Sequence, residues 1–195
     1  YRGACPDVLL SSTNFLLERH PHQKEDIVMS TSQTRDGGCI CGQVRYRVTS
    51  EPMIVHCCHC RGCQKNSGSA FALNALFEAD RVELISGEVE LITVPTPSGT
   101  GQDITRCTKC KTAVWSNYNM GGIRERIRFI RVGTLDDPDQ LPPDVHIYSG
   151  SKQPWVILPK EDQSAEAFYE FKETWSPESM ERLAKVKETA NSANP

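Results

Sequence analysis

Residues 37–49 read GGCICGQVRYRVT, a close pair of cysteines followed directly by an alternating stretch. The apolar side chains of that stretch are Val44, Tyr46 and Val48, and the polar ones are Gln43, Arg45 and Arg47. Alternation of this kind is typical of a β-strand with one buried face. The sequence therefore predicts a strand over residues 43–49 that begins beside two thiols. Glycines on both sides of the cysteine pair free the backbone to turn there.

A second close pair, Cys107 and Cys110, follows a loop rich in glycine and proline at residues 95–101. Two such pairs far apart in the sequence are a common way for a β-rich domain to build a closed zinc site of four thiolates. Each pair supplies two corners of a tetrahedron, and the ion ties distant strands together. We therefore predict a structural zinc site at Cys39, Cys41, Cys107 and Cys110. Buried free thiols are the alternative interpretation.

Residues 56–63 read HCCHCRGC and hold a further group of cysteines. Cys58, Cys60 and Cys63 have a spacing at which three thiols reach one ion, and three protein ligands with an open fourth position are typical of a catalytic zinc. Neighbouring residues seldom both bind one ion, so Cys57 stays outside this set. The side chains that can close the fourth position and make the site structural are His56, His59 and Cys57. A redox pair at Cys57 and Cys60, or at Cys60 and Cys63, is a further alternative, although thioredoxin-like βαβ surroundings are missing.

An open zinc can polarise a carbonyl group, or bind an incoming thiol and stabilise it as thiolate near neutral pH. His56 and His59 are the candidate general bases. Basic residues near the ligands either attract an anionic substrate or are ordinary surface charges; they are Arg61, Lys65, Arg106, Lys109 and Lys111.

The rest of the central region also predicts short strands. Alternating or apolar runs lie at residues 71–77, 81–85, 89–94 and 127–132. A turn at residues 86–88 separates the second run from the third and predicts a hairpin. Short strands at this spacing indicate an all-β domain. Beyond residue 158 the pattern changes to a short helix within residues 165–175, and then to a helix with Ser176 as its N-cap and Pro177 at its first position.

The composition limits the classes of protein to which the chain can belong. Its 195 residues are 38% hydrophobic and 24% charged, with a formal net charge of −3 and a pI near 6.0. These values exclude a disordered chain and argue against a nucleic-acid binder. No apolar run approaches the roughly 20 residues that span a bilayer. The nine cysteines lie mostly in tight pairs, so we predict metal-binding thiols in a reducing compartment, the cytoplasm.

The N-terminal stretch lacks the organisation of a secretory signal. We expect residues 1–36 to be an extension before the domain, with Met29 as the natural start and a preceding leader that is not native. An ordered extension packed on the domain is the alternative. Cys5 has no cysteine or histidine close to it in the sequence and is not expected to bind metal.

Five ordered motifs carry a resemblance to a known family. They are Gly38-Cys39-x-Cys41-Gly42-x-Val44-x-Tyr46, His56-x-Cys58-His59-Cys60-Arg61-x-Cys63-Gln64-x-x-Ser67-Gly68, Cys107-x-x-Cys110 with Trp115, Gly133-Thr134-Leu135-Asp136-Asp137-Pro138, and His146-Ile147-Tyr148 with Trp155. Together they resemble the glutathione-dependent formaldehyde-activating enzyme family, within the centromere protein V-like superfamily. The resemblance covers residues 37–158.

The resemblance implies a mainly β fold, a β-tent of several coiled antiparallel sheets stapled by zinc, with a short helical C-terminal extension. We place the zinc-binding β-tent domain at residues 37–158 and an acidic helical tail at residues 159–195. The family's structural zinc would bind Cys39, Cys41, Cys107 and Cys110, and its catalytic zinc would bind Cys58, Cys60 and Cys63. Two zinc ions per chain are therefore expected. Cys57 and the C-terminal extension depart from the family pattern.

The activity implied by the resemblance is that of a carbon–sulfur lyase, which joins glutathione to formaldehyde to give S-(hydroxymethyl)glutathione. The expected partners are a small-molecule thiol, with glutathione as the candidate cosubstrate, and an aldehyde or other electrophile. No nucleic acid or membrane partner is expected. Two alternatives stay open: the same zinc scaffold acting on a different small molecule, as in secondary metabolism, or a non-catalytic zinc-stapled binding module.

Overall fold

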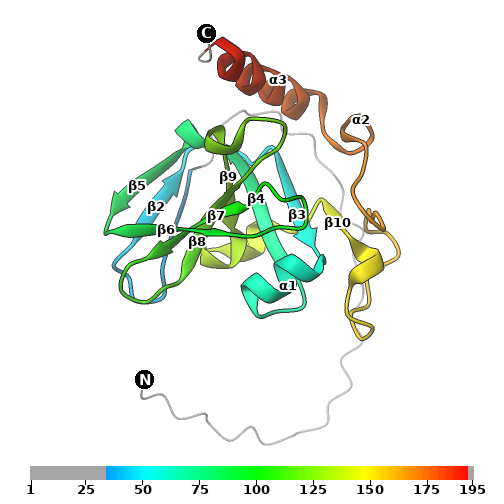
Figure 1. Ribbon diagram of the computed structural model, residues 1–195, viewed down its shortest axis with the longest axis horizontal. Coiled ribbons are helices and arrows are strands. Elements are labelled where there is room, and N and C mark those ends of the chain that lie inside the picture. The colour runs from blue at the N-terminus through cyan, green and yellow to red at the C-terminus, as the bar shows by residue number, and fades with distance from the viewer. Residues whose placement is uncertain (1–33, 193–195) are drawn as a thin grey trace, which may run out of the picture. The chain divides into compact units, whose positions relative to one another are not determined.

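The computed structural model describes residues 34–192, which belong to one structural unit, Ser32–Pro195. Strands dominate and form a three-stranded sheet, in the order β1-β2-β5, and a seven-stranded sheet, in the order β10-β3-β4-β9-β8-β7-β6 (Figure 1). The strands are β1 Arg35–Gly38, β2 Arg45–Val48, β3 Ile54–Cys58, β4 Ala72–Glu78, β5 Val82–Ser86, β6 Val89–Val94, β7 Gln102–Cys107, β8 Ala113–Tyr118, β9 Ile127–Arg131 and β10 Val145–Ile147. The α-helices are α1 Arg61–Ser67, α2 Phe171–Thr174 and α3 Pro177–Ser192, and the short 3-10 helices are Ala79–Arg81, Arg124–Arg126, Val132–Thr134, Pro138–Gln140 and Ser149–Ser151. The expectation of a mainly β protein with a short C-terminal helix is confirmed.

Strand pairing is antiparallel with one exception among the described strands. β10 pairs with β3 in parallel, so that His146 lies opposite Cys57 and Ile147 lies opposite Cys58. This parallel pair departs from the prediction, which expected antiparallel sheets. Parallel neighbours need a long connection, and the whole chain between Cys58 and Val145 supplies it here. This pairing brings the motif around residue 146 against the motif around residue 57.

The hairpin expected at residues 86–88 is wrong. β5 pairs with β2 in the three-stranded sheet, whereas β6 pairs with β7 in the seven-stranded sheet. Gly87 has a φ of +89°, and a Cβ at this position would come within 2.2 Å of the carbonyl oxygen of Gln43. The chain therefore crosses between the sheets at Gly87. No other residue fits this position, because a side chain would clash with the backbone of Gln43, which cannot move aside.

The two sheets enclose one apolar core. Val44, Tyr46 and Val48, the predicted apolar face of β2, are fully buried in it. The ring of Tyr46 meets Trp115 of β8 edge-on, with the ring centroids 5.7 Å apart. Alternate residues of β4 face this core, including Ala75 and Phe77. The strand predicted from alternation at residues 43–49 is thus confirmed together with its buried face.

A second core cluster covers the other face of the seven-stranded sheet. It joins Leu76 and Ile127 of the sheet to Trp175, Leu183 and Val186 at the C-terminal end of the chain. As predicted, Ser176 caps α3: its Oγ accepts a hydrogen bond from the backbone N–H of Ser179 at 3.1 Å. The short helix expected within residues 165–175 is α2 alone.

Several predictions are not tested by the described residues. Those for Met29 and Cys5 lie outside the described residues, and the domain boundaries after residues 36 and 158 stay predictions. None of the described helices combines the length and the apolar character needed to cross a membrane.

Candidate metal centres

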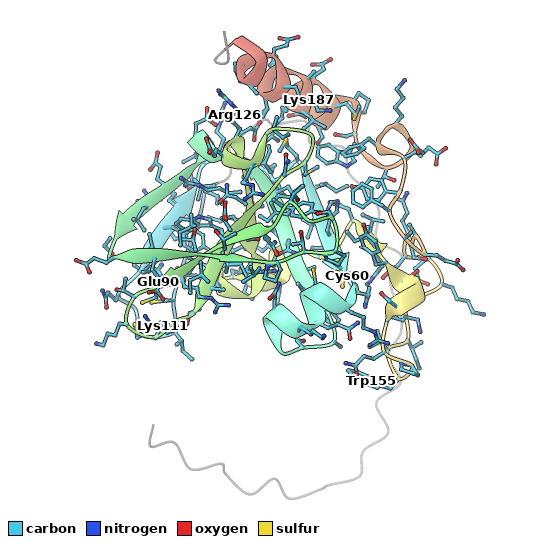
Figure 2. The ribbon with its side chains drawn as sticks, viewed as in Figure 1. Cys60, Glu90, Lys111, Arg126, Trp155 and Lys187 are labelled. Atoms are coloured by element: carbon cyan, nitrogen blue, oxygen red, sulfur yellow. The ribbon has the colours of Figure 1, made fainter. Side chains whose placement is uncertain are left out.

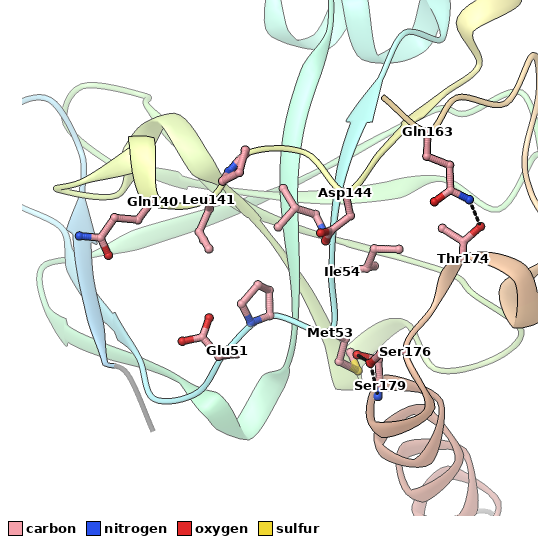
Figure 3. Close-up of a pocket in the computed structure, with 13 residues that line it drawn as sticks. Glu51, Met53, Ile54, Gln140, Leu141, Asp144, Gln163, Thr174, Ser176 and Ser179 are labelled. Atoms are coloured by element: carbon pink, nitrogen blue, oxygen red, sulfur yellow. Dashed lines mark hydrogen bonds between the residues drawn. The ribbon is translucent and has the colours of Figure 1, made fainter. Parts of the chain in front are cut away.

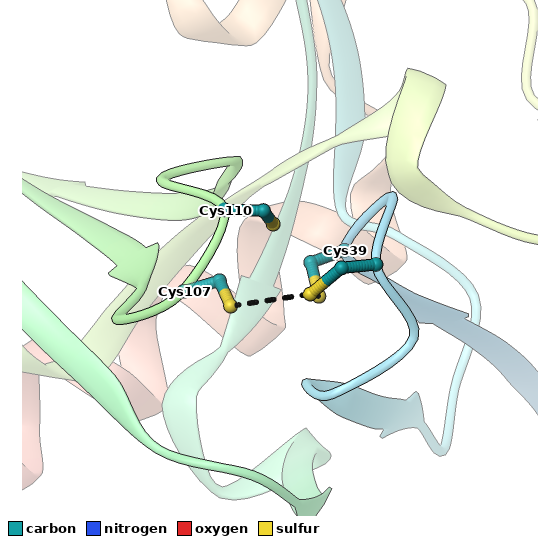
Figure 4. A group of neighbouring side chains, drawn as sticks. Cys39, Cys107 and Cys110 are labelled. Carbon is teal, nitrogen blue, oxygen red and sulfur yellow. Dashed lines mark hydrogen bonds between the residues drawn. The ribbon is translucent and has the colours of Figure 1, made fainter.

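Cys39, Cys41, Cys107 and Cys110 come together in what we call the four-cysteine cluster (Figure 4). Cys39 and Cys41 lie in the turn after β1, whereas Cys107 ends β7 and Cys110 lies in the turn before β8. The Sγ atoms of Cys39 and Cys41 are 3.4 Å apart, and those of Cys41 and Cys107 are 3.9 Å apart. Tetrahedral zinc with Zn–S bonds of about 2.3 Å places its sulfur ligands about 3.8 Å from one another. The donor set and its spacing therefore fit a zinc ion.

Hydrogen bonds favour the thiolate form at two members of the four-cysteine cluster, Cys39 and Cys110. The backbone N–H of Val44 donates to Cys39 Sγ at 3.2 Å. Hydrogen bonds from the hydroxyl and the backbone of Thr112 lower the pKa of Cys110 to about 5. Lys111, with a φ of 61°, turns the chain tightly so that its N–H reaches the carbonyl oxygen of Cys107 at 3.0 Å. The turn thus holds both cysteines of the second pair in position.

Cys58, Cys60 and Cys63 form a separate three-cysteine cluster, with all Sγ atoms within 4.8 Å of one another. Cys58 ends β3, and Cys60 is the N-cap of α1, where Figure 2 labels it. The Sγ of Cys60 accepts a hydrogen bond from the backbone N–H of Cys63 at 3.3 Å. Hydrogen bonds from Cys58 and Cys63 lower the pKa of Cys60 to about 2, whereas hydrogen bonds with Cys60 and Cys63 raise the pKa of Cys58. The cluster can hold a negative charge and offers three soft donors to one metal ion.

The fourth position of the three-cysteine cluster receives no protein ligand within residues 34–192. No cysteine, histidine, aspartate or glutamate of the described chain joins the three thiols. The three side chains that the sequence offered for this position lie elsewhere. Cys57 and His59 belong to another group, described below, and His56 faces an aromatic residue.

His56 is buried against the segment that leads into α2. Its Nε2 lies 2.5 Å from the hydroxyl of Tyr169, which also accepts a hydrogen bond from Trp175 Nε1 at 2.6 Å. Burial lowers the pKa of His56 to about 4. Its ring is thus neutral near pH 7 and engaged by a tyrosine.

Cys57, His59 and His146 form a third group, which we call the mixed triad. His59 Nε2 lies 3.5 Å from Cys57 Sγ and 3.0 Å from His146 Nδ1. His146 Nε2 lies 3.1 Å from a carboxylate oxygen of Asp162. Sequence reasoning placed His146 in a family motif but gave it no contact, because 87 residues separate it from His59.

Sequence reasoning also missed Arg131, a cation near the three-cysteine cluster. It lies at the end of β9 opposite Asn74, and its Nη1 donates to the side-chain oxygen of Asn74 at 2.7 Å. Burial lowers the pKa of Arg131, and the negative charges of Cys63 and Cys58 oppose that shift. Only the strand pairing reveals this placement, since Arg131 lies far from the cysteines in the sequence.

Three of the five expected cations near the ligands have local partners: Arg61, Arg106 and Lys111. Arg61 donates to Gln64 Oε1 at 2.8 Å, and Arg106 donates to the carbonyl oxygen of Lys111 at 2.9 Å. Lys111 forms an ion pair with Glu90 at 2.9 Å, and both residues are labelled in Figure 2. These contacts support the turns that carry the cysteines.

A pocket of about 480 Å³ lies away from all three groups (Figure 3). Its walls include Met53, Asp144, Gln163 and Ser179, and no member of the two cysteine clusters or the mixed triad. The carboxylate of Asp144 accepts a hydrogen bond from the backbone N–H of Val55 at 2.7 Å. Asp144 thus supports β3, and the chemistry of the cysteines lies outside this pocket.

Comparison with known proteins relates the chain to a family, to a curated protein and to a solved structure. Residues 34–151 match the family described as glutathione-dependent formaldehyde-activating enzyme. A protein of Halomonas elongata, to which that enzyme's name is provisionally given, is 27% identical over 132 residues, which cover 66% of this chain and 83% of that protein. The crystal structure of a Rhodobacter sphaeroides protein is 18% identical, with a TM-score of 0.40, over 52% of this chain and 87% of that chain. The family match contains both cysteine clusters and the mixed triad.

Proposed function

The chain belongs to the glutathione-dependent formaldehyde-activating enzyme family, and from this premise we propose that it is a zinc-dependent enzyme that adds a thiol such as glutathione to formaldehyde or a related small electrophile. In this reaction the thiol loses its proton and a bond forms between its sulfur and the carbonyl carbon. The carbon–oxygen π bond breaks, and the carbonyl oxygen takes a proton. With glutathione and formaldehyde the product is S-(hydroxymethyl)glutathione, and its reverse cleavage is the reaction of a carbon–sulfur lyase.

The observation that carries the proposal is the presence of three thiols, and not four protein ligands, in the three-cysteine cluster. Three protein ligands leave a position for substrate, as in catalytic zinc sites, whereas four close the site. A zinc ion held by Cys58, Cys60 and Cys63 supplies the positive charge that lowers the pKa of an incoming thiol and polarises a carbonyl group. We assign the four-cysteine cluster to a second, structural zinc that staples the sheets of a β-tent.

Gln64 fixes the three-cysteine cluster to the neighbouring backbone. Its side-chain amide donates to the carbonyl oxygens of His59, at 2.6 Å, and Ser151, at 3.0 Å. Gln64 lies on α1 beside Cys63, so these bonds fix the helix relative to the strand that ends at Cys58. Fixed ligands keep the open position in one place, which an enzyme needs to orient its substrate.

Near the three-cysteine cluster, Arg131 supplies a positive charge and Tyr148 supplies a proton donor. Zinc with three thiolates carries a net negative charge, and the Arg131 guanidinium offsets it. Burial raises the pKa of Tyr148, and the negative charges of Cys58 and Cys60 raise it further. Its hydroxyl therefore keeps its proton at neutral pH and is our candidate donor to the carbonyl oxygen.

Two further readings share the same scaffold. An enzyme that uses a different small electrophile would keep the same cluster, so a panel of aldehydes has to accompany formaldehyde in the assay. A fourth protein ligand would favour a non-catalytic binding module, and the described residues bring none into the three-cysteine cluster. Free thiolate ligands suit a reducing compartment, so we place the protein in the cytoplasm.

The test is the rate at which glutathione and formaldehyde interconvert with their adduct, measured by exchange NMR at equilibrium. This method separates a catalysed rate from the uncatalysed background. Cys60→Ser should reduce the catalysed rate by a factor on the order of 100 or more, because charge stabilisation by a metal ion contributes several kcal/mol. Cys5→Ser, the matched loss of a thiol outside the described residues, should leave the rate unchanged. A wild-type rate equal to background with every thiol and aldehyde tried would refute the proposed activity.

A further inference from the structure

The mixed triad is a buried group of metal-ligating side chains that the proposed reaction does not use. The exposed fractions are 2% for Cys57, 0% for His59 and 7% for His146. One ligand atom from each residue lies within 4.8 Å of the others. A thiol and two imidazoles are thus withdrawn from water together, with their donor atoms close to one another.

The triad and the three-cysteine cluster take alternate residues of one short segment. Cys57 and His59 belong to the triad, whereas Cys58 and Cys60 belong to the three-cysteine cluster. Successive side chains of an extended chain point to opposite faces. The segment stays extended past β3, because the N–H of His59 donates to the carbonyl oxygen of Ile147 at 2.9 Å. One strand can therefore serve two separate centres, one on each face.

The third member of the triad comes from the parallel neighbour. β10 places His146 directly opposite Cys57. Paired residues of neighbouring strands point to the same face of a sheet, so this register delivers the imidazole to the face that already carries Cys57 and His59. A shift of the register by one residue would turn His146 to the other face.

We propose that the mixed triad is a third metal centre, which binds zinc through Cys57 Sγ, His59 Nε2 and His146 Nδ1. Two imidazole nitrogens and one thiolate are among the donors that zinc selects. His59 Nδ1 has no hydrogen-bond partner in the described chain, so the interactions of this ring depend on Nε2. The donor atoms are as close together as the ligands of one ion must be.

Asp162 completes the arrangement from outside the triad. Its carboxylate lies 3.1 Å from His146 Nε2, the ring nitrogen that would not bind the metal. A histidine ligand that donates its second N–H to a carboxylate is a recurrent outer arrangement of zinc sites, because it fixes the ring and raises its basicity. The Cys57 thiolate and the Asp162 carboxylate would together balance the charge of Zn²⁺, so that the buried ion would not be left with an unpaired charge.

The alternative is a metal-free chain of hydrogen bonds from Cys57 through the two histidines to Asp162. Metal counting by native mass spectrometry on the full-length protein, loaded with zinc, separates the two. We expect three zinc ions per chain in the wild type and two in Cys57→Ser. His56→Asn, a matched loss of a buried polar side chain from the same strand, should keep three. A zinc count that is the same in the wild type and in Cys57→Ser would overturn the proposal, whatever the occupancy of the other two clusters.

A second measurement needs no variant and does not depend on folding of a mutant. Cadmium NMR shifts increase with the number of thiolate ligands, so the wild-type protein loaded with cadmium should show three resonances. They would correspond to four, three and one thiolates, and the third would be the least shifted. Absence of the one-thiolate resonance would overturn the proposal. The inference is independent of the proposed function, because Cys60→Ser should remove the three-thiolate resonance and leave the one-thiolate resonance in place.

Discussion

The two cysteine clusters use the same ligand atom but differ in what holds them together. In the four-cysteine cluster 66 residues separate Cys41 from Cys107, and its two halves follow β1 of one sheet and β7 of the other. The three-cysteine cluster is contained within residues 58–63 and needs only the end of β3 and the start of α1. An ion in the first would join two sheets, whereas an ion in the second would join one turn.

We propose that this difference separates a role in stability from a role in chemistry. A link between distant residues restricts the unfolded chain much more than a link within one turn, because loop-closure entropy grows with loop length. The local cluster restricts little, but its missing fourth ligand leaves room for a substrate. The contrast teaches that the number and origin of the thiols, and not thiols as such, distinguish the two roles.

The largest effect should follow from Cys107→Ser, which breaks the long-range cluster. We expect loss of its zinc and unfolding, because binding at structural zinc sites contributes up to about 10 kcal/mol of folding free energy. Thermal unfolding followed by circular dichroism measures the change. Cys60→Ser is the matched control, since it also removes one thiol ligand, and its midpoint should stay close to that of the wild type. Equal losses in both variants would erase the contrast between the clusters.

A smaller effect, on activity, should follow from Arg131→Gln. Removal of this cation leaves the negative charge of the three-cysteine cluster uncompensated, and kcat/KM should fall about tenfold, which corresponds to about 1.4 kcal/mol. Arg131→Lys keeps the charge and should recover most of the rate, which a role in packing alone would not explain. Unchanged kcat/KM in Arg131→Gln would show that the cation plays no part in the chemistry.

A third prediction concerns the stability of the fold, through an ion pair away from both clusters. Glu78 of β4 accepts hydrogen bonds from Arg182 of α3 at 2.7 and 2.5 Å. Burial is the largest single influence and raises the pKa of Glu78. The hydrogen bonds from Arg182, a backbone hydrogen bond and the positive charges of Arg182 and Arg81 together outweigh burial, so the pKa is lowered from 4.5. We expect Glu78→Gln to reduce the unfolding free energy at pH 7 by about 1.5–3 kcal/mol.

The lowered pKa also sets the direction of the pH dependence. The stability that Glu78 contributes is present above its unfolded-state pKa and is lost as the pH falls through the lower folded-state pKa. Denaturant titrations of wild type and Glu78→Gln should therefore converge below pH 4.5. Glu90→Gln, which removes the more exposed pair with Lys111, should change the unfolding free energy by less than about 1 kcal/mol. A constant difference between wild type and Glu78→Gln at every pH would contradict the ionic origin.

Much of the local structure could be predicted from residue patterns. Alternation located β2 and its buried face, and Ser176 with Pro177 located the start of α3. The spacing of the cysteines also separated the four-cysteine cluster from the three-cysteine cluster, and the structure brings together the same residues. These features follow from backbone geometry and hydrogen bonds over a few residues, so neighbouring sequence is enough to specify them.

Partners that lie far apart in the sequence could not be predicted in this way. The turn at residues 86–88 has the composition of a hairpin, yet Gly87 carries the chain between sheets because it packs against the backbone of Gln43. Arg131 reaches the three-cysteine cluster only through the pairing of β9 with β4. Strand pairing depends on which faces are buried against each other, and that is a property of the whole core.

The sequence by itself thus determined the cysteine sets, the family and the predominance of strands, because each is expressed in short motifs or in local periodicity. Tertiary structure alone decided which distant side chains lie beside the cysteines. The parallel register of β10 with β3 places His146 beside Cys57 and His59, which takes two candidates for the fourth zinc position into a separate group. A ligand set closes only when distant strands pack in one register, and no local pattern specifies that register.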